Sequence, residues 1–244
     1  MLGEVAPEPV SGTPPNDDPD STKPSPKART WNRIIQGLKA AQKYSAIGFT
    51  AFAGLHLTST IVLPALVSVD AGNAALMAGR TLYQSSLGEP LWVYGSLLLH
   101  ITSGLILHAR RVYIAKTRHG RWICGLTPTI TSGLILTVLA SSHLYATRLK
   151  PTMALGDSSL ISLDFITWAL KDNIWVTGSA IILLSFVFFD HALRGVDYWY
   201  RLGIKYYRNA IVGAMVGLTA LSLARIRAAP DVTGWIASQY QLAH

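Results

Sequence analysis

The stretch Pro90–Arg121, PLWVYGSLLLHITSGLILHARRVYIAKTRHGR, decides the fold class of this chain. It opens on Trp92 and Tyr94, aromatic residues of the kind that lie at a membrane–water boundary. An apolar run follows to Leu107, and a basic segment then ends it. This pattern predicts a membrane-crossing helix with its stop signal.

Polar residues inside that apolar run set it apart from an ordinary span. His100 is predicted near the middle of the bilayer, and Gly104 and His108 follow at helical spacing on the same face. An ionisable residue at that depth is costly. We therefore expect His100 to face the interior of a helix bundle, next to a partner or a ligand.

The composition extends this interpretation to the whole chain. Of the 244 residues, 50% are hydrophobic and only 14% are charged, which is typical of a polytopic membrane protein. The single cysteine, Cys124, excludes an internal disulfide framework and a cysteine-based metal cluster.

Five apolar segments are each close to the ~20 residues that cross about 30 Å of hydrocarbon. They lie at about residues 46–69, 91–112, 128–147, 174–193 and 209–225. The predicted fold is therefore all-α, a five-helix transmembrane bundle over residues 44–227. Gly213 and Gly217 on the last segment predict a close helix contact.

The segments around the bundle have their own patterns. Residues 1–30 are rich in proline and acidic residues and are predicted to be a disordered cytosolic tail. Residues 31–43 predict a basic helix on the membrane surface, and residues 157–173 predict a second interfacial helix. Residues 228–244 form a C-terminal tail.

The distribution of lysine and arginine predicts the orientation. With a cytosolic N-terminus, the cytosolic side receives 15 of the 21 basic residues, which is the bias expected of a multi-pass protein. We therefore expect a cytosolic N-terminus and a C-terminus across the membrane.

Histidines recur in four successive spans. The candidates are His56, His100, His143 and His191, with His108 as a fifth nearer the cytosolic end. Neutral imidazole is a good axial ligand of haem iron, and a bundle core can hold the macrocycle, so haem b is the cofactor that this pattern indicates. The alternative is that the histidines only form hydrogen bonds across the bundle, and the spacing leaves both open.

Depth along the spans restricts the pairing of these histidines only in part. The pairs His56/His100 and His108/His191 match in depth more easily than His56/His143 and His100/His191, which need tilt or shifted boundaries. The sequence does not choose between them.

Hydroxyl side chains are frequent in the spans. Thr60 and Ser103 are candidate hydrogen-bond partners for the rings of His56 and His100. Others are candidates for a polar path for lipid headgroups, or for ordinary hydrogen bonds between helices. This set is Thr58, Ser59, Thr102, Ser103, Thr131, Ser132, Ser141, Ser142, Thr177 and Ser179.

Two short motifs carry a first family resemblance. The run from Gly54 to Leu63, GLHLTSTIVL, and the motif His100-x-x-x-Gly104 resemble haem-ligand segments in the membrane cytochrome b subunits of succinate:quinone and fumarate reductases. This resemblance implies haem ligation by histidines on separate spans of a five-helix bundle.

A second resemblance covers residues 44–225. Its motifs are His100-x-x-Ser103-Gly104 in a span ending at Arg110-Arg111, and His143 followed by Arg148 and Pro151. With the proline-rich tail, these resemble a fungal mitochondrial outer-membrane lipid-homeostasis family, five-span proteins that compensate loss of the ER–mitochondria tether. The resemblance implies recruitment of a bridge-like lipid-transfer protein through a tail Pro-x-Pro motif, and help for lipids crossing between leaflets.

Two tail segments fit the Pro-x-Pro pattern. Pro7 and Pro9 form one, and Pro24 and Pro26 form the other, which we prefer because lysines flank it.

Three functions follow as hypotheses: a lipid-homeostasis factor, a haem b membrane cytochrome with partner subunits, and a passive membrane tether. The sequence shows no nucleophile–base pair, phosphate loop or paired carboxylates, so no catalytic residue and no metal beyond haem iron are predicted. We expect the chain not to be an enzyme, unless it scrambles lipids or transfers electrons. The lipid-homeostasis hypothesis is preferred, with haem b as the candidate cofactor and no cofactor as the alternative.

Overall fold

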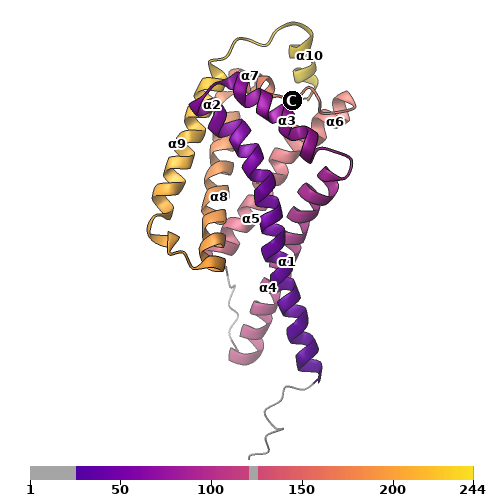
Figure 1. Cartoon of the computed structure of the whole chain (residues 1–244), viewed down its shortest axis with the longest axis vertical. Coiled ribbons are helices and arrows are strands. Elements are labelled where there is room, and N and C mark those ends of the chain that lie inside the picture. Colours follow the sequence, from indigo (N-terminus) through magenta and orange to yellow (C-terminus); the bar gives the residue numbers. More distant parts are fainter. Residues whose placement is uncertain (1–25, 121–125, 244) are drawn as a thin grey trace, which may run out of the picture. The chain divides into compact units, whose positions relative to one another are not determined.

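The structure is a computed structural model, which describes residues 26–120 and 126–243 (Figure 1). The chain divides into two compact units, Met1–Gly37 and Leu38–His244. The second unit contains the arrangement described below.

The described residues contain helices and no strand. The first half contains α1 (Pro26–Leu57), η1 (Thr58–Val62), α2 (Leu63–Leu66), α3 (Val69–Tyr83), η2 (Gly88–Gly95) and α4 (Ser96–His119). The second half contains α5 (Pro128–Leu144), η3 (Tyr145–Leu149), α6 (Lys150–Leu155), α7 (Leu163–Asp172), α8 (Ile174–Tyr200), η4 (Ile204–Tyr206), α9 (Arg208–Arg227) and α10 (Gly234–Ala243).

Five helical stretches are long and apolar enough to cross a membrane. They are Pro26–Leu66, Gly88–Arg118, Pro128–Leu155, Ile174–Tyr200 and Arg208–Arg227. Each overlaps one predicted span, so the all-α, five-span fold is confirmed. The predicted surface helix at residues 31–43 is part of the continuous helix α1 in the structure.

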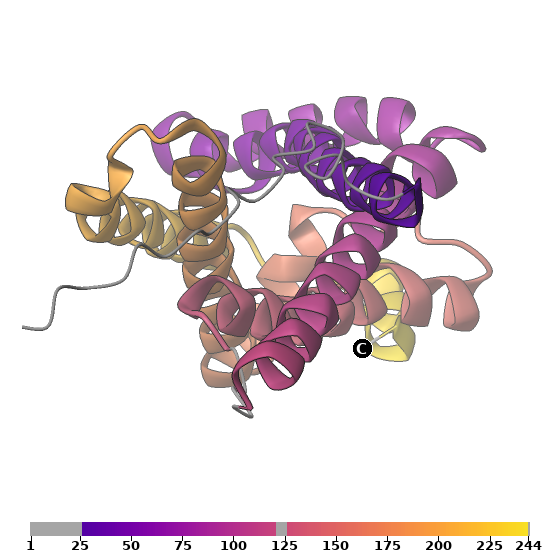
Figure 2. The same ribbon diagram turned by 90° about the horizontal axis from the view of Figure 1, so that it is seen from below.

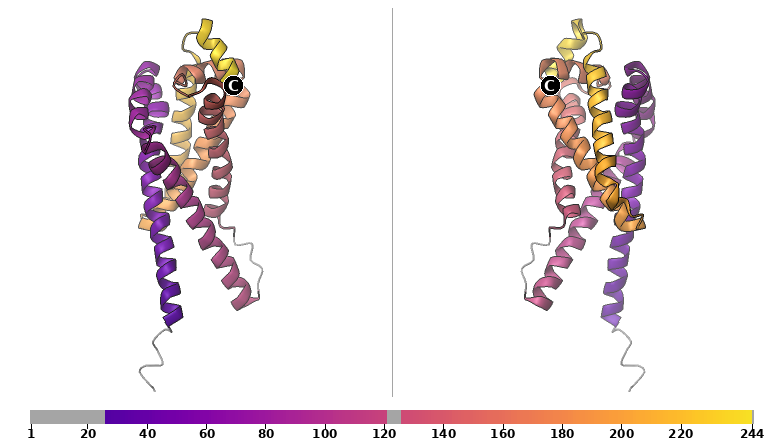
Figure 3. Two further views of the ribbon diagram at one scale, coloured as in Figure 1. Left: turned by 90° about the vertical axis from the view of Figure 1, so that its right-hand side faces the viewer. Right: turned by 90° about the vertical axis from the view of Figure 1, so that its left-hand side faces the viewer.

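The connecting helices gather at one end of the second unit. Figures 1 and 3 show α2, α3, α6, α7 and α10 at this end, which we call the α3 end. The turn between α8 and α9 lies at the opposite ends of those two helices, which we call the α8–α9 end, and α4 extends beyond it. Helix α8 packs against both α5 and α9 (Figure 2).

Helix α7 lies in the predicted interfacial segment, but its apolar face is buried in protein. Leu163 and Leu170 pack with Leu76 of α3 and Ile226 of α9 in one core cluster. On the same helix, Phe165 packs with Tyr240 of α10. This helix therefore closes the α3 end of the bundle.

Helix α3 approaches the end of the first span very closely at Gly72. A Cβ atom placed on Gly72 would lie 2.5 Å from Cγ of Pro64 and 2.7 Å from the carbonyl oxygen of Ser59. Only a residue without a side chain allows this approach, because the backbone oxygen of Ser59 has no room to move.

The close packing of α3 returns the chain into the bundle before α4 begins. At the end of α3, the ring of Tyr83 meets that of Phe52 at 5.0 Å between centroids. Trp92 Nε1 then donates to the carbonyl of Gly48 at 2.8 Å. Gly48 precedes Leu66 by eighteen residues, about 27 Å of helix. Trp92 of η2 therefore contacts the first helical stretch, Pro26–Leu66, near its middle.

Buried hydroxyl groups form hydrogen bonds between the spans. Pro64 has no N–H, so the carbonyl of Thr60 lacks its usual helical donor. The Ser222 hydroxyl of α9 donates to this carbonyl at 2.9 Å. Between α8 and α9, the hydroxyls of Ser185 and Thr219 share a hydrogen bond of 2.8 Å.

Arginines hold α3 and η3 against the link between α6 and α7. Arg80 donates to the carbonyls of Ser158 at 2.7 Å and Ile161 at 2.6 Å, and burial lowers the pKa of its guanidinium. Arg148 forms an ion pair with Glu89 and donates to the Ser158 hydroxyl. These bonds fix the α3 end from both sides.

The two glycines of α9 do not form the predicted close helix contact. A Cβ atom on Gly213 or Gly217 would meet no heavy atom within 4 Å among the residues that the structure describes. The sides of α8 and α9 that face each other carry Ser185 and Thr219 instead.

Gly72→Ala should destabilise the protein strongly. The added methyl group overlaps the Ser59 carbonyl and the Pro64 ring, so the free energy of unfolding should fall by about 3 kcal/mol. Chemical unfolding in detergent measures this change. Gly217→Ala is the matched control and should be neutral or slightly stabilising, because Ala favours helix and the site is open. Equal unfolding of the two variants would contradict the close contact at Gly72.

Candidate functional site: two pairs of histidines

His100 on α4 and His191 on α8 form the first pair. Their ring centroids are 6.1 Å apart and their planes meet at 83°. Both residues are partly buried. The pair joins spans that are far apart in sequence, and it lies level with Gln42 of α1 and the first turns of α5.

Hydrogen bonds fix the same ring nitrogen on both histidines. His100 Nδ1 lies 3.1 Å from the carbonyl oxygen of Gln42. His191 Nδ1 lies 3.2 Å from the carbonyl oxygen of Thr129 and 3.2 Å from the hydroxyl of Ser132. A carbonyl only accepts, so Nδ1 carries a proton in both rings, and in the neutral imidazole with this proton the lone pair is on Nε2. This is the tautomer that a metal ligand requires.

His56 on α1 and His143 on α5 form the second pair. Their ring centroids are also 6.1 Å apart, with an angle of 62° between the planes. The ring of Phe52 stacks on His56 at 5.8 Å and so holds it from the side. Both pairs therefore present two imidazoles at the same separation.

The spacing within each pair fits two imidazoles on one metal ion. A metal–imidazole nitrogen bond is about 2 Å, and the ring centre lies roughly 1 Å behind the nitrogen, so two opposed ligands have centres roughly 6 Å apart. Both measured separations are 6.1 Å. No group of three or more metal-ligating side chains occurs within the described ranges. Two imidazoles at this separation suit a metal whose remaining ligands belong to a macrocycle, such as haem iron.

The two pairs lie at different depths. On α1, Gln42 and His56 are separated by fourteen residues, and on α5, Ser132 and His143 by eleven. At 1.5 Å per residue the pairs are thus about 16–21 Å apart along the bundle. The pair His100/His191 is the one nearer the α8–α9 end.

This pairing is the one that sequence depth favoured less. His100 meets His191 rather than His56, because α3 returns the chain before α4 begins and so shifts α4 along the bundle. His108, on the same helix, has a buried Nδ1 that makes no hydrogen bond within the described part of the chain.

The hydroxyl partners predicted for the histidine rings make other bonds. Thr60 donates to the backbone carbonyl of His56 at 2.7 Å, and Ser103 donates to the carbonyl of Leu99 at 2.6 Å. The ring of His100 is instead held by the backbone of Gln42. Sequence reasoning missed Gln42 because a backbone acceptor leaves no mark in the residue pattern.

The hydroxyls predicted to line a lipid path are mostly satisfied by their own helices. Thr102, Thr131 and Ser142 donate to the carbonyls four residues earlier. Ser59 and Ser179 donate to the carbonyls three residues earlier. These bonds hold the hydroxyl hydrogens within single helices, and the polar path stays a prediction.

The predicted partner-binding prolines fall largely outside the described part of the chain. Pro7, Pro9 and Pro24 lie beyond it, while Pro26 is the first residue of α1.

Gly133→Ala should displace the ring of His191. A Cβ atom on Gly133 would lie 2.9 Å from Cε1 of His191, so we expect a loss of about 1–2 kcal/mol in unfolding free energy from overpacking. In the double variant Gly133→Ala/His191→Ala the second change removes the ring and should relieve the clash. Unfolding of the four proteins forms the double-mutant cycle.

Gly195→Ala on α8 is the control, because no heavy atom lies within 4 Å of its built Cβ. Strict additivity of Gly133→Ala and His191→Ala would show that the two residues do not touch.

Comparison with known families identifies part of the membrane region. Residues 138–229 match the family model described as MDM10-complementing protein 1, transmembrane domain, and this segment contains His143 and His191. No curated protein and no solved structure gives a significant match, so the predicted resemblance to cytochrome b subunits has no match to support it. The match over residues 138–229 supports the resemblance of this chain to the fungal mitochondrial lipid-homeostasis family that the sequence motifs indicated.

Proposed function

We propose that this chain is a lipid-homeostasis protein of the mitochondrial outer membrane that carries haem b in its membrane core. The family match supports the lipid role, and the two histidine pairs support the cofactor. The single observation that carries the cofactor is the pair His100/His191, with both Nδ1 atoms held by carbonyls and the rings 6.1 Å apart.

Each histidine pair would hold one haem. His100 and His191 would ligate one iron near the α8–α9 end, and His56 and His143 would ligate another closer to the α3 end. When bound, haem would supply reversible one-electron transfer. The chain's own part is to present neutral Nε2 lone pairs, because the carbonyls of Gln42 and Thr129 hold the Nδ1 protons of the first pair.

The burial of four imidazoles argues against a passive tether. A membrane anchor needs only apolar spans, whereas polar rings inside a span carry a cost that a function must offset. The four histidines are placed in pairs rather than each being bonded to its own helix.

The absorption spectrum of the purified full chain tests the cofactor. We expect a Soret band, sharpened visible bands on reduction, little change with carbon monoxide because both axial positions are filled, and two haems per chain. His100→Ala or His191→Ala should remove one haem, and His56→Ala or His143→Ala the other, since each pair needs both ligands.

His119→Ala and His108→Ala are the controls and should keep both haems, because the proposed ligand pairs are His56/His143 and His100/His191. Colourless protein that stays folded after haem supplementation would remove the cofactor from the proposal and leave the lipid role intact. The histidines would then serve hydrogen bonding alone, worth on the order of 1 kcal/mol each in a membrane bundle.

The lipid role would be exerted through the cytosolic tail. The bias of basic residues supports a cytosolic N-terminus, and the resemblance implies that a tail Pro-x-Pro motif recruits a bridge-like lipid-transfer protein. Movement of lipid between leaflets stays a prediction from the resemblance, and the hydroxyls of the spans do not support it.

Replacing Pro24 and Pro26 by Ala should abolish recruitment of the lipid-transfer protein and leave membrane insertion unchanged. Recruitment is measured by co-purification from mitochondria. Replacing Pro7 and Pro9 is the matched control and should have no effect, because that motif lacks basic neighbours. Loss of recruitment only with the second pair would reassign the motif, and recruitment that survives both changes would end the docking proposal. A tag at Thr13 must be accessible to protease on intact mitochondria for either result to count.

A further inference from the structure

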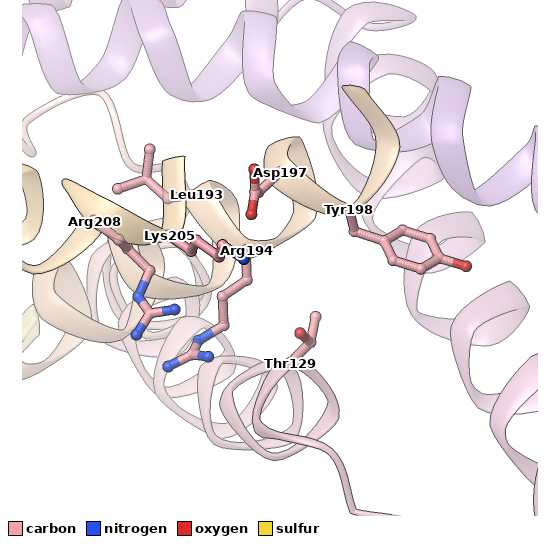
Figure 4. A pocket seen from close by; sticks show the side chains of 7 residues that line it. All are labelled: Thr129, Leu193, Arg194, Asp197, Tyr198, Lys205 and Arg208. Carbon is pink, nitrogen blue, oxygen red and sulfur yellow. The ribbon is translucent and has the colours of Figure 1, made fainter. Parts of the chain in front are cut away.

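Two cavities are lined by residues of α8, the helix that carries His191, and by residues at or near the start of α5. The first, of about 220 Å³, lies at the α8–α9 end and is lined by Thr129, Arg194, Asp197, Lys205 and Arg208 among others (Figure 4). The second, of about 340 Å³, lies between α5 and α8 and is lined mainly by apolar side chains, with Asp190 among them. The polar cavity and an apolar groove thus lie on the same pair of spans.

The polar cavity carries unbalanced positive charge. Arg194 donates to Asp190 at 2.7 Å, and Arg208 Nε lies 3.2 Å from the other oxygen of the same carboxylate. One carboxylate is thus shared by two guanidiniums, which lie side by side in Figure 4. Arg208 Nε is buried and makes no hydrogen bond among the described residues, so the alignment with Asp190 is poor and the guanidinium keeps donor capacity.

The other acidic residue beside the polar cavity, Asp197, already accepts a hydrogen bond. Asp197 accepts a hydrogen bond from the backbone N–H of Ile204 at 3.0 Å. Lys205 lies exposed at the rim, with its ammonium 5.0 Å above the ring of Tyr206. Arg194, Lys205 and Arg208 against Asp190 and Asp197 leave one net positive charge, which a phosphodiester with its single negative charge would neutralise.

The second cavity supplies the apolar half of a lipid site. Pro128 and Ile135 of α5 face Phe186 and Val187 of α8 along it. Phe186 is 49% exposed and Ile135 is 46% exposed, although both lie in membrane-spanning helices. Apolar side chains open to the hydrocarbon beside a cationic pocket match the two parts of a phospholipid, an acyl chain and a phosphate.

We propose that the polar cavity and the apolar cavity together form a binding site for one anionic phospholipid of the surrounding leaflet. The guanidiniums of Arg194 and Arg208 and the ammonium of Lys205, which we call the basic corner, hold its phosphate, and an acyl chain lies against Ile135 and Phe186. Arginine suits this role because its planar fork donates two parallel hydrogen bonds to a phosphate. The proposal needs only the membrane location of the chain, and neither haem binding nor tail recruitment.

The proposed lipid site is next to His191 of the first histidine pair. Thr129 lines the polar cavity and its carbonyl binds His191 Nδ1, while Ser132 lines the apolar cavity and bonds the same nitrogen. A lipid bound here would therefore contact the residues that orient His191.

Native mass spectrometry of the full chain in detergent tests the proposal. The probes are dioctanoyl phosphatidylglycerol, dioctanoyl phosphatidylcholine and glycerol phosphate. We expect one phosphatidylglycerol per chain, bound more tightly than phosphatidylcholine, and glycerol phosphate bound weakly because it has no acyl chain. Lys205→Gln and Arg208→Gln should each weaken phosphatidylglycerol binding about tenfold, by loss of a charge-assisted hydrogen bond.

Arg201→Gln is the matched control, because it removes the same charge from the same turn at a residue that does not line the cavity. It should leave binding unchanged. Phe186→Ala should weaken phosphatidylglycerol binding and leave glycerol phosphate binding unchanged. Thermal unfolding checks each variant, and Arg208→Lys, which keeps the charge near Asp190, replaces Arg208→Gln if that variant does not fold. Arg208→Lys should weaken phosphatidylglycerol binding a few-fold, because the planar guanidinium that donates two parallel hydrogen bonds is lost.

Four outcomes would overturn the proposal. Equal losses with Arg201→Gln and Lys205→Gln would indicate a diffuse surface charge. Equal binding of phosphatidylcholine and phosphatidylglycerol would remove the anion selectivity. Glycerol phosphate bound as tightly as phosphatidylglycerol would indicate a site for free phosphates. Loss of haem from Lys205→Gln with lipid binding intact would assign the pocket to carboxylates of the cofactor.

Discussion

The close contact of Gly72 with η1 is the constraint on which the rest of the structure depends. Because Gly72 has no side chain, α3 lies against the Pro64 ring and the Ser59 carbonyl, and it returns the chain along the first span. Trp92 therefore meets Gly48 rather than the end of α2. This displacement sets the depth of every residue on α4, and it brings His100 level with His191.

In the membrane region, hydrogen bonds and ion pairs offset the free-energy cost of burying polar groups. Hydroxyls bond to carbonyls of their own helix, or, like Ser222, to a carbonyl that a proline has left free. Arginines at the α3 end are satisfied by carbonyls and by Glu89. The histidines differ, since one nitrogen of His100 and of His191 is held by backbone and the ring faces another histidine. That difference is the physical reason for the proposal that they hold a ligand and do more than pack.

The proposed sites for haem at His100/His191 and for an anionic phospholipid both lie at the α8–α9 end. The first turns of α5 orient His191 through Thr129 and Ser132, and the same residues line the two cavities beside the basic corner. Segments that lie 60 residues apart in the chain, around Thr129 and around His191, thus form one site. The family match covers His191 and the basic corner, whereas His56 and His100 lie outside it.

The sequence by itself determined the class of the protein. Apolar runs of span length, the basic residues that end them and the histidines within them predicted five transmembrane helices and the candidate ligands, because hydrocarbon thickness and the cost of buried charge act on each span separately. The pairing of His56 with His143 and of His100 with His191 came only from the tertiary structure. Depth counted from apolar boundaries favoured the other pairs, since the packing of α3 at Gly72 is a contact between segments and leaves no periodic pattern. The carbonyl of Gln42 and the cluster of Arg194, Lys205 and Arg208 escaped prediction for the same reason: backbone acceptors and loop cations acquire their roles only when the helices that carry them are packed together.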